Sequence, residues 1–229
     1  MSYLGYTSFI SNFCYFLSNQ PNFNRDITIL EIGVDRGQTA LPLLHNLTIK
    51  NLNFIFVGVD IRYDSGFAEQ VRQMDLVRDR SEGYLSANYF YTIQNSLDFL
   101  ESFTTENPDA KFDVVLLDGD HNYQTVSKEL EYFNQITYPH SLCILDDYNG
   151  RHAHVDTYYA DNEDHADLPH KKFDRKFEKK GMQNAVNDFI EANDNWSFHN
   201  KNPPFEPVII RRDLLINETP EGIIISLKQ

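Results

Sequence analysis

The sequence is poor in cysteine, with only Cys14 and Cys143 in 229 residues. The two are far apart, and Cys143 lies inside the apolar run SLCIL, where a small buried thiol is the simplest expectation. This pattern favours a reducing setting over a disulfide-stabilised one. We therefore expect a cytoplasmic protein.

Long apolar runs are also missing. No segment approaches the roughly 20 apolar residues that a membrane-spanning helix requires. The first 20 residues have some apolar periodicity, but they lack a basic region and a small-residue cleavage site. We expect neither membrane insertion nor a signal peptide.

Basic residues are in deficit. Lys and Arg number 20 against 34 Asp and Glu, which gives a formal net charge of -14. Such a charge repels a phosphate backbone, so nucleic acid is not expected as a partner. A small molecule remains the expected partner, and homo-oligomerisation stays open.

Apolar residues are plentiful, at 41 % with 14 % aromatic, and the length suits one globular domain over residues 1–229. Five short apolar runs read as buried strands, and segments of helical length separate them. The alternation predicts an α/β fold, a doubly wound, mostly parallel Rossmann-like sheet with helices on both faces. The five runs are ITILEIG (27–33), FIFVGVD (54–60), YFYTIQ (89–94), FDVVLLD (112–118) and LCILDD (142–147).

The chain divides into four parts by texture. Residues 1–26 read as an N-terminal helical segment and 27–148 as the core. Residues 149–181 are polar and His-rich and read as a lid or insert, although the H-x-H of His152 and His154 leaves a second metal site open. Residues 182–229 read as a helix followed by strands, with a late antiparallel strand expected at PVIIRR.

Polar residues follow each expected strand. In an open parallel sheet, ligands bind at the carboxyl ends of the strands, so these residues are the site candidates. They are Glu31 and Gly33, Asp60, Asn95 and Ser96, Asp118, and Asp146 with Asp147.

The loop EIGVDRG, residues 31–37, contains Gly33 and Gly37, which would let the backbone turn tightly and approach a ligand. The dinucleotide fingerprint G-x-G-x-x-G is not matched, because its second glycine position is Asp35. With Glu31 nearby, this loop disfavours a pyrophosphate and favours a ligand with a cationic amino acid end. S-adenosylmethionine is such a ligand.

Asp60 ends the run VGVD, 23 residues beyond Gly37. An acid in this place accepts hydrogen bonds from both hydroxyls of a ribose. The alternative is that Asp60 caps the segment that follows.

On these residues the chain resembles the class I S-adenosylmethionine-dependent methyltransferases. The resemblance covers residues 27–148, with further support to residue 212 from GMQNAVNDF and PVIIRR. It implies that Glu31, Gly33 and Gly37 hold the methionine part and that Asp60 holds the ribose. It also implies that Asn95 and Ser96 flank the adenine.

Three carboxylates, those of Asp118, Asp146 and Asp147, would meet in one crevice if the fourth and fifth strands are neighbours. Unpaired, they would repel one another strongly, so a hard cation such as Mg²⁺ is the economical explanation. The alternative is that they cap helices and turns. Asp120 stays open between a role at the site and a helix cap.

His121 lies three residues after Asp118, where the chain enters the next helix. A group that titrates near neutrality beside a metal is suited to accept a proton from an attacking hydroxyl, although a lone histidine is more often structural. The set is similar to catechol O-methyltransferase and to the macrocin O-methyltransferase group. That resemblance implies that Asp118, Asp146 and Asp147 bind the metal and that His121 takes the proton, with Asp118 also in the catalytic set and beside the cofactor.

The expected function is S-adenosylmethionine-dependent, magnesium-assisted O-methylation of a small hydroxylated acceptor, a sugar or natural product. Two alternatives stay open. One is a non-catalytic protein of the same fold that binds a ligand or metal, and the other is a nicotinamide-dependent oxidoreductase.

Overall fold

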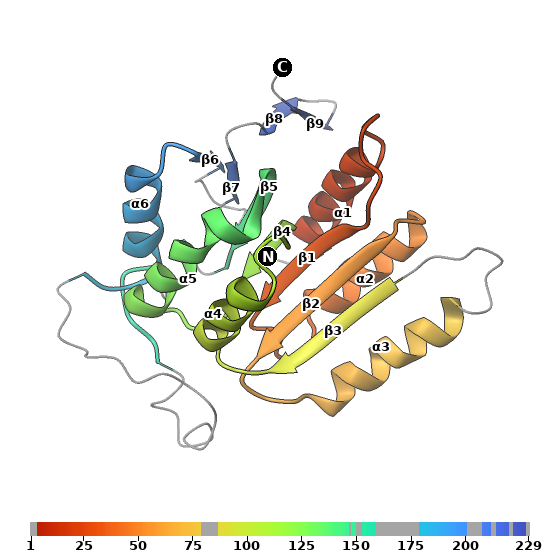
Figure 1. Ribbon diagram of the computed structural model, residues 1–229, viewed down its shortest axis with the longest axis horizontal. Helices are drawn as coiled ribbons and strands as arrows, with labels where there is room; N and C mark the ends of the chain where they lie inside the picture. Colours follow the sequence, from red (N-terminus) through yellow and green to blue (C-terminus); the bar gives the residue numbers. More distant parts are fainter. Residues whose placement is uncertain are drawn as a thin grey trace.

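The fold is an α/β sandwich around one large sheet (Figure 1). The computed structural model describes residues 4–78, 87–146, 148–149, 153–158, 179–200, 208–211, 214–219 and 222–227.

The sheet of the described chain has seven strands in the order β3-β2-β1-β4-β5-β7-β6. The first five run parallel, and β7 is antiparallel to both β5 and β6, as the late antiparallel strand was expected to be. Their bounds are β1 Ile27–Ile32, β2 Phe54–Asp60, β3 Ala87–Ile93, β4 Phe112–Leu117, β5 Thr137–Leu145, β6 Trp196–Asn200 and β7 Val208–Arg211.

Helices cover both faces of the sheet, as predicted. In Figure 1, α4, α5 and α6 lie on the face toward the viewer, and α1 and α2 lie behind the sheet. A separate antiparallel hairpin of β8 and β9 follows the sheet in sequence. The bounds are α1 Leu4–Ser18, α2 Ala40–Ile49, α3 Ser65–Arg78, α4 Ser96–Glu106, α5 Tyr123–Ile136, α6 Met182–Ala192, β8 Leu214–Thr219 and β9 Gly222–Leu227.

Two hydrophobic cores fill the space between the sheet and its helices. Successive side chains of a strand point to opposite faces, so Val114 and Leu116 of β4 join the core of α1 and α2. Val115 and Leu117 join the core of α4, α5 and α6. All six residues of β4 are buried, and five of them are apolar, as expected for a strand covered on both faces. The exception is Asp113, which is paired with Arg25.

An ion pair between Arg25 and Asp113 lies at the start of β4, the end away from the cavity. The Asp113 side chain is fully buried and accepts two hydrogen bonds from Arg25, at 2.7 and 2.6 Å. His140 Nε2 lies 3.1 Å from Asp113 Oδ1, and the Thr28 backbone N–H donates to Oδ2. Burial raises the pKa of Asp113, but the hydrogen bonds from Arg25 and His140 outweigh it and hold that pKa below its usual value.

The sheet places β1 between β2 and β4. Strands β2 and β3 are added on one side of β1, and β4 and β5 on the other, so the topological switch point lies beside β1. Leu117 of β4 pairs with Ile32 of β1 on one side and with Leu145 of β5 on the other. The residues that follow these three strands therefore share one crevice, which is where ligands bind in this class of sheet. Within the described residues, no helix combines the length and apolarity needed to cross a bilayer.

Candidate active site

A cavity of about 430 Å³ opens at the carboxyl ends of β1, β2 and β4. Most residues predicted for the site from their positions after the strands line it. The full lining is Glu31, Ile32, Gly33, Val34, Asp35, Gln38, Thr39, Val59, Asp60, Ile61, Arg62, Gln94, Asn95, Ser96, Asp118, Gly119, Asp120, His121 and Asp146.

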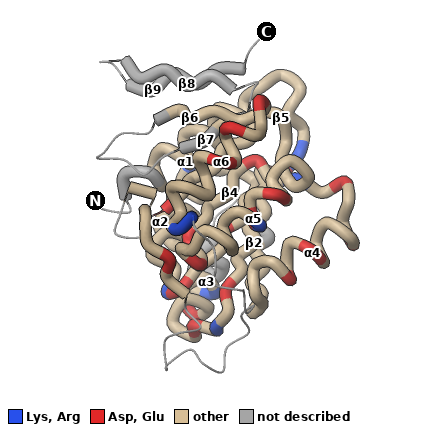
Figure 2. The backbone as a smooth tube through the Cα atoms, turned by 90° about the vertical axis from the view of Figure 1, so that its left-hand side faces the viewer, with Lys and Arg blue, Asp and Glu red and all other residues tan. Residues whose placement is uncertain are grey.

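The cavity is strongly acidic. Its lining carries six carboxyl groups, from Glu31, Asp35, Asp60, Asp118, Asp120 and Asp146, and Arg62 is its one Lys or Arg among the described residues. Acidic positions are likewise spread over the surrounding helices (Figure 2). Such a lining disfavours a pyrophosphate and favours a ligand that brings positive charge.

Glu31 is the most deeply buried of these acids, with 1 % of its surface exposed. Burial raises its pKa well above the ordinary value, and the charges of Asp118 and Asp60 raise it further. Within the described part of the chain, its Oε2 has no hydrogen-bond partner. A cationic ligand placed here would stabilise the ionised form of this group.

The two glycines of the first loop have different surroundings. Gly33 lines the cavity at φ +86°, and a β-carbon on it would lie 2.0 Å from the Asp118 carbonyl oxygen. Gly37, at φ +75°, does not line the cavity, and its β-carbon would lie 2.2 Å from Cδ2 of Phe67 on α3. Gly33 therefore borders the cavity as predicted for the loop, whereas Gly37 packs against Phe67 and is not part of the cavity lining.

Asp60 holds the turns on both sides of it. Its Oδ2 accepts the Asp35 backbone N–H at 2.7 Å, and its Oδ1 accepts the Arg62 backbone N–H at 3.0 Å. The capping alternative for Asp60 is therefore realised. Asp60 also lines the cavity, so the same carboxylate borders the space proposed for a ribose.

Asn95 and Ser96 form the start of α4 at the cavity wall. Asn95 is the N-cap, and its side chain accepts the Leu97 backbone N–H at 3.0 Å. The Ser96 hydroxyl donates to Glu129 of α5 at 2.5 Å. Both residues are buried, at 6 % and 9 % exposure, so their positions are fixed before any ligand arrives.

Asp118, His121 and Asp146 converge. Each offers a ligand atom, and these atoms all lie within 4.8 Å of one another. The convergence follows from strand pairing: the Asp118 N–H donates to Ile32 O at 2.9 Å, and the Asp146 N–H donates to Leu117 O at 3.0 Å. His121 is 6 % exposed, and its Nε2 lies 3.5 Å from Asp118 Oδ1. Asp147, the third predicted metal ligand, lies outside the described residues.

Asp120 is held by the first turn of α5. Its Oδ2 accepts hydrogen bonds from the side chains of Asn122 and Thr125, both at 3.2 Å. The N-cap of α5 is Asn122, whose side chain accepts the Thr125 N–H at 2.8 Å. Asp120 is therefore not the helix cap. It lines the cavity beside the cluster of Asp118, His121 and Asp146.

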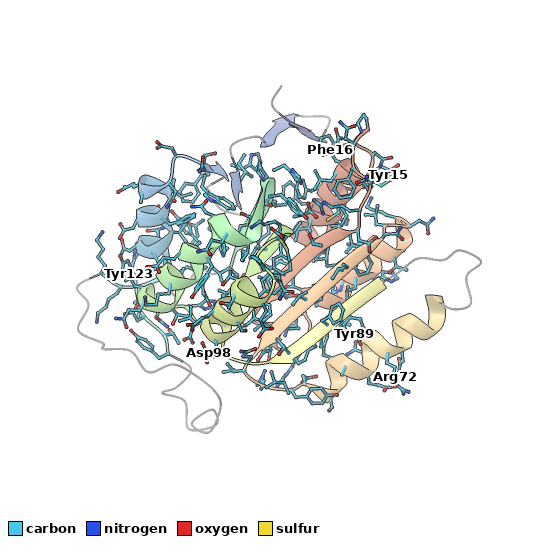
Figure 3. All side chains as sticks on the ribbon, viewed as in Figure 1. Tyr15, Phe16, Arg72, Tyr89, Asp98 and Tyr123 are labelled. Atoms are coloured by element: carbon cyan, nitrogen blue, oxygen red, sulfur yellow. The ribbon has the colours of Figure 1, made fainter. Side chains whose placement is uncertain are left out.

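The predicted insert begins against the active-site loop. The Thr157 N–H donates to the His121 carbonyl, and Asp156 Oδ1 accepts the N–H groups of Tyr123 and Gly181, at 2.8 and 2.7 Å. Tyr123, labelled in Figure 3, opens α5 and donates its hydroxyl to Asp188 of α6. Of the two histidines considered for a second metal site, His152 lies outside the described residues and His154 is exposed.

Glu129 was not predicted, although it touches the site residue Ser96. It is fully buried on α5, and burial, followed by the charge of Asp120, raises its pKa to about 8 against the lowering effect of the Ser96 hydrogen bond. A signal was present in the sequence, since position 129 falls between Val126 and Phe133 on the apolar face of the helix. Gln38, Thr39, Arg62 and Gln94 also line the cavity and gave no such signal.

The sequence matches a known protein family over its central part. A family model described as a methyltransferase domain matches residues 30–148, more than half of the chain. This chain belongs to the methyltransferase domain family. It is an S-adenosylmethionine-dependent methyltransferase. Among curated proteins, no sequence matches this methyltransferase.

Solved structures share the methyltransferase fold at low identity. The apo structure of CalS11, a TDP-rhamnose 3'-O-methyltransferase of calicheamicin biosynthesis, has a TM-score of 0.53 and 13 % identity, covering 90 % of this chain and 78 % of CalS11. A second CalS11 structure has the same TM-score at 12 % identity and the same coverages. MycE from the mycinamycin pathway, in complex with Mg and SAH, has a TM-score of 0.49 and 15 % identity, covering 92 % of this chain and 53 % of MycE.

Proposed function

We propose that this methyltransferase transfers the methyl group of S-adenosylmethionine to a hydroxyl oxygen of a small molecule, with the help of Mg²⁺ or another hard divalent cation. One observation carries the proposal. The cluster of Asp118, His121 and Asp146 borders the same cavity as the acidic loop and strand ends at Glu31 and Asp60.

The cavity suits the donor. The cationic amino acid end would lie near Glu31, whose buried carboxyl group has an oxygen without a partner among the described residues. The ribose would lie at Asp60 and the adenine at Asn95 and Ser96, because these residues follow β2 and β3 along the same wall. S-adenosylmethionine carries no phosphate, so the acidic lining does not oppose it.

The cluster suits a divalent cation by its chemistry. Asp118 and Asp146 bring carboxylate oxygens, the donors that Mg²⁺ prefers, and Asp147 would add another. When bound, such a cation would hold the acceptor hydroxyl and lower its pKa. The protein's own part is to hold the two carboxylates together through β4 and β5.

His121 is the proton acceptor in this proposal. It is buried against Asp118, and its backbone is paired with Thr157 at the start of the insert. As the acceptor oxygen forms its bond to the methyl carbon, the carbon–sulfur bond breaks and the hydroxyl proton passes to the imidazole. Alignment of the reacting atoms in line supplies the rest of the catalysis.

The proposal is tested in two steps. Calorimetry with S-adenosylhomocysteine should show binding, and no binding at millimolar ligand would contradict the donor site. A panel of hydroxylated acceptors, including TDP-rhamnose because CalS11 acts on it, should then be screened for methyl transfer with and without Mg²⁺. Transfer that is unaffected by a chelator would contradict the metal's role.

A further inference from the structure

One carboxyl group stands directly behind the cavity wall. Glu129 Oε1 lies 2.5 Å from Ser96 Oγ, and a β-carbon built on Gly119 would lie 3.9 Å from the same oxygen. Ser96 and Gly119 both line the cavity, whereas Glu129 is fully buried on α5 and does not. Glu129 therefore makes no direct contact with the cavity, and its hydrogen bond reaches the cavity wall at Ser96.

Three polar groups face Glu129 from the elements around it. Ser96 comes from α4, Asp120 from the loop after β4, and Cys143 from β5. The nearby charge of Asp120 and burial both favour the neutral acid, and the other oxygen, Oε2, has no partner within the described residues. Burial and the charge of Glu129 hold the pKa of the Cys143 thiol well above its usual value, so Cys143 stays neutral. With its pKa raised to about 8, Glu129 carries a proton at neutral pH.

The proton of Glu129 decides what Ser96 offers to the cavity. A serine hydroxyl has one proton to donate and two lone pairs to accept with. The hydrogen bond in the structure runs from the Ser96 hydroxyl to Glu129 Oε1, the direction that an ionised acid imposes. When Glu129 carries a proton, the acid can donate to Ser96 Oγ instead, and the serine proton is then available to a ligand. If Glu129 is ionised, the serine proton turns to the carboxylate and Ser96 presents only a lone pair.

We propose that Glu129 is a positioning residue that directs the Ser96 hydroxyl into the cavity, where it donates a hydrogen bond to a ring nitrogen of a bound adenine. This rests on the proposed placement of the adenine at Ser96. Adenine offers acceptor nitrogens around both rings and a single amino donor group, so a donating serine has more partners on it than an accepting one. The arrangement predicts that affinity for an adenosyl ligand decreases when Glu129 loses its proton.

The test measures adenosine and S-adenosylhomocysteine binding by calorimetry between pH 6.5 and pH 9.5. Adenosine is included because none of its groups titrates in this range. Affinity of the unmodified protein should fall by about fivefold, the value of one ordinary hydrogen bond. Glu129→Gln, which stays neutral, should keep its affinity across the range. Glu131→Gln, an exposed neighbour on the same helix, should follow the unmodified protein.

Comparing the variants with one another cancels the effect of the other titrating groups of the cavity. Glu31 also has a raised pKa, and it is present in every protein compared, so only the difference due to Glu129 is scored. Ser96→Ala provides a second route that leaves Glu129 intact: it should bind weakly and lose the fall above neutral pH. Circular dichroism at both pH limits confirms that each variant is folded.

Three outcomes decide the matter. A flat Glu129→Gln profile with a falling profile in the control supports the inference. A fall that persists in Glu129→Gln or in Ser96→Ala overturns it while the cofactor site stands. No binding of either ligand at any pH overturns both this inference and the proposed function.

Discussion

Gly33 and Asp118 are in direct backbone contact: the place where a β-carbon of Gly33 would stand is 2.0 Å from the Asp118 carbonyl oxygen. The contact joins the loop after β1, which is the proposed cofactor side, to the strand end that carries the proposed metal ligand. The close approach of these two loops therefore depends on the absence of a side chain at position 33.

Gly33→Ala should displace this contact. The added carbon cannot be accommodated, and the φ of +86° is strained for alanine, so we expect a loss of S-adenosylhomocysteine binding of at least about tenfold and a lower melting temperature. Gly66→Ala is the control, because Gly66 is an exposed helical glycine whose β-carbon would meet only the Asp64 side chain. Equal behaviour of the two variants would contradict the packing role of Gly33.

Asp146→Ala should weaken metal binding and leave cofactor binding intact. Removing one carboxylate of the cluster should abolish metal-dependent methyl transfer and weaken Mn²⁺ binding, measured by electron paramagnetic resonance, by about tenfold or more. S-adenosylhomocysteine affinity should change by less than about twofold, since Asp146 lies after β5 at the far side of the cavity from Asp60 and Asn95. Asp109→Ala, at an exposed position, should leave all three measurements unchanged.

His121→Gln tests the proton acceptor. Loss of a positioned general base lowers kcat by about 10²- to 10⁴-fold, while cofactor binding should persist. Mn²⁺ affinity distinguishes two roles of the ring, because a large loss would make His121 a metal ligand and no loss would leave it as the base. His45→Gln on α2 is an exposed control, and full activity of His121→Gln would refute both roles.

Asp113→Asn should destabilise the protein without touching the cavity. Arg25 would lose a charged partner, and we expect the free energy of unfolding at pH 7 to fall by about 2–3 kcal/mol, less than for a fully buried pair because the Arg25 side chain is 30 % exposed. The pKa of Asp113 is lowered in the folded state, so its contribution is complete above the ordinary aspartate pKa of about 4 and is lost as pH falls through the folded value.

Urea unfolding at a series of pH values checks this. The difference between the unmodified protein and Asp113→Asn should be constant near neutrality and should shrink in acid. A difference that grows in acid would contradict the assignment.

The fold was predictable because its central strands are buried on both faces. Runs such as VVLL within FDVVLL have no polar alternation to confuse them with surface strands, and the one polar residue of β4, Asp113, is itself buried in an ion pair. The start of β5 was not predicted. Its first residues, TYPHS, carry a proline and a histidine, and pairing with β4 shifts register in this stretch, so the apolar signal begins only near Leu142.

The site was predictable where strand topology alone places residues. Asp118 and Asp146 were expected to meet if β4 and β5 were neighbours, and the pairing of Leu117 with Leu145 makes them so. The ion pair of Arg62 with Asp35 could not be read from sequence, because it depends on the positive φ of Asp35 and on how two loops meet. The burial of Glu129 could have been predicted from helical spacing, but only a structure shows that its hydrogen-bond partner is Ser96.

Asp156 ties the start of α5 to the start of α6. One oxygen of its side chain accepts backbone N–H groups from Tyr123 and Gly181, so the two stems of the segment between residues 158 and 179 are fastened to one point beside His121. These hydrogen bonds come from the two ends of the segment, so they do not depend on the sequence between those ends. Removing the Asp156 carboxylate would therefore release the two helix starts from one another, beside the loop that carries His121.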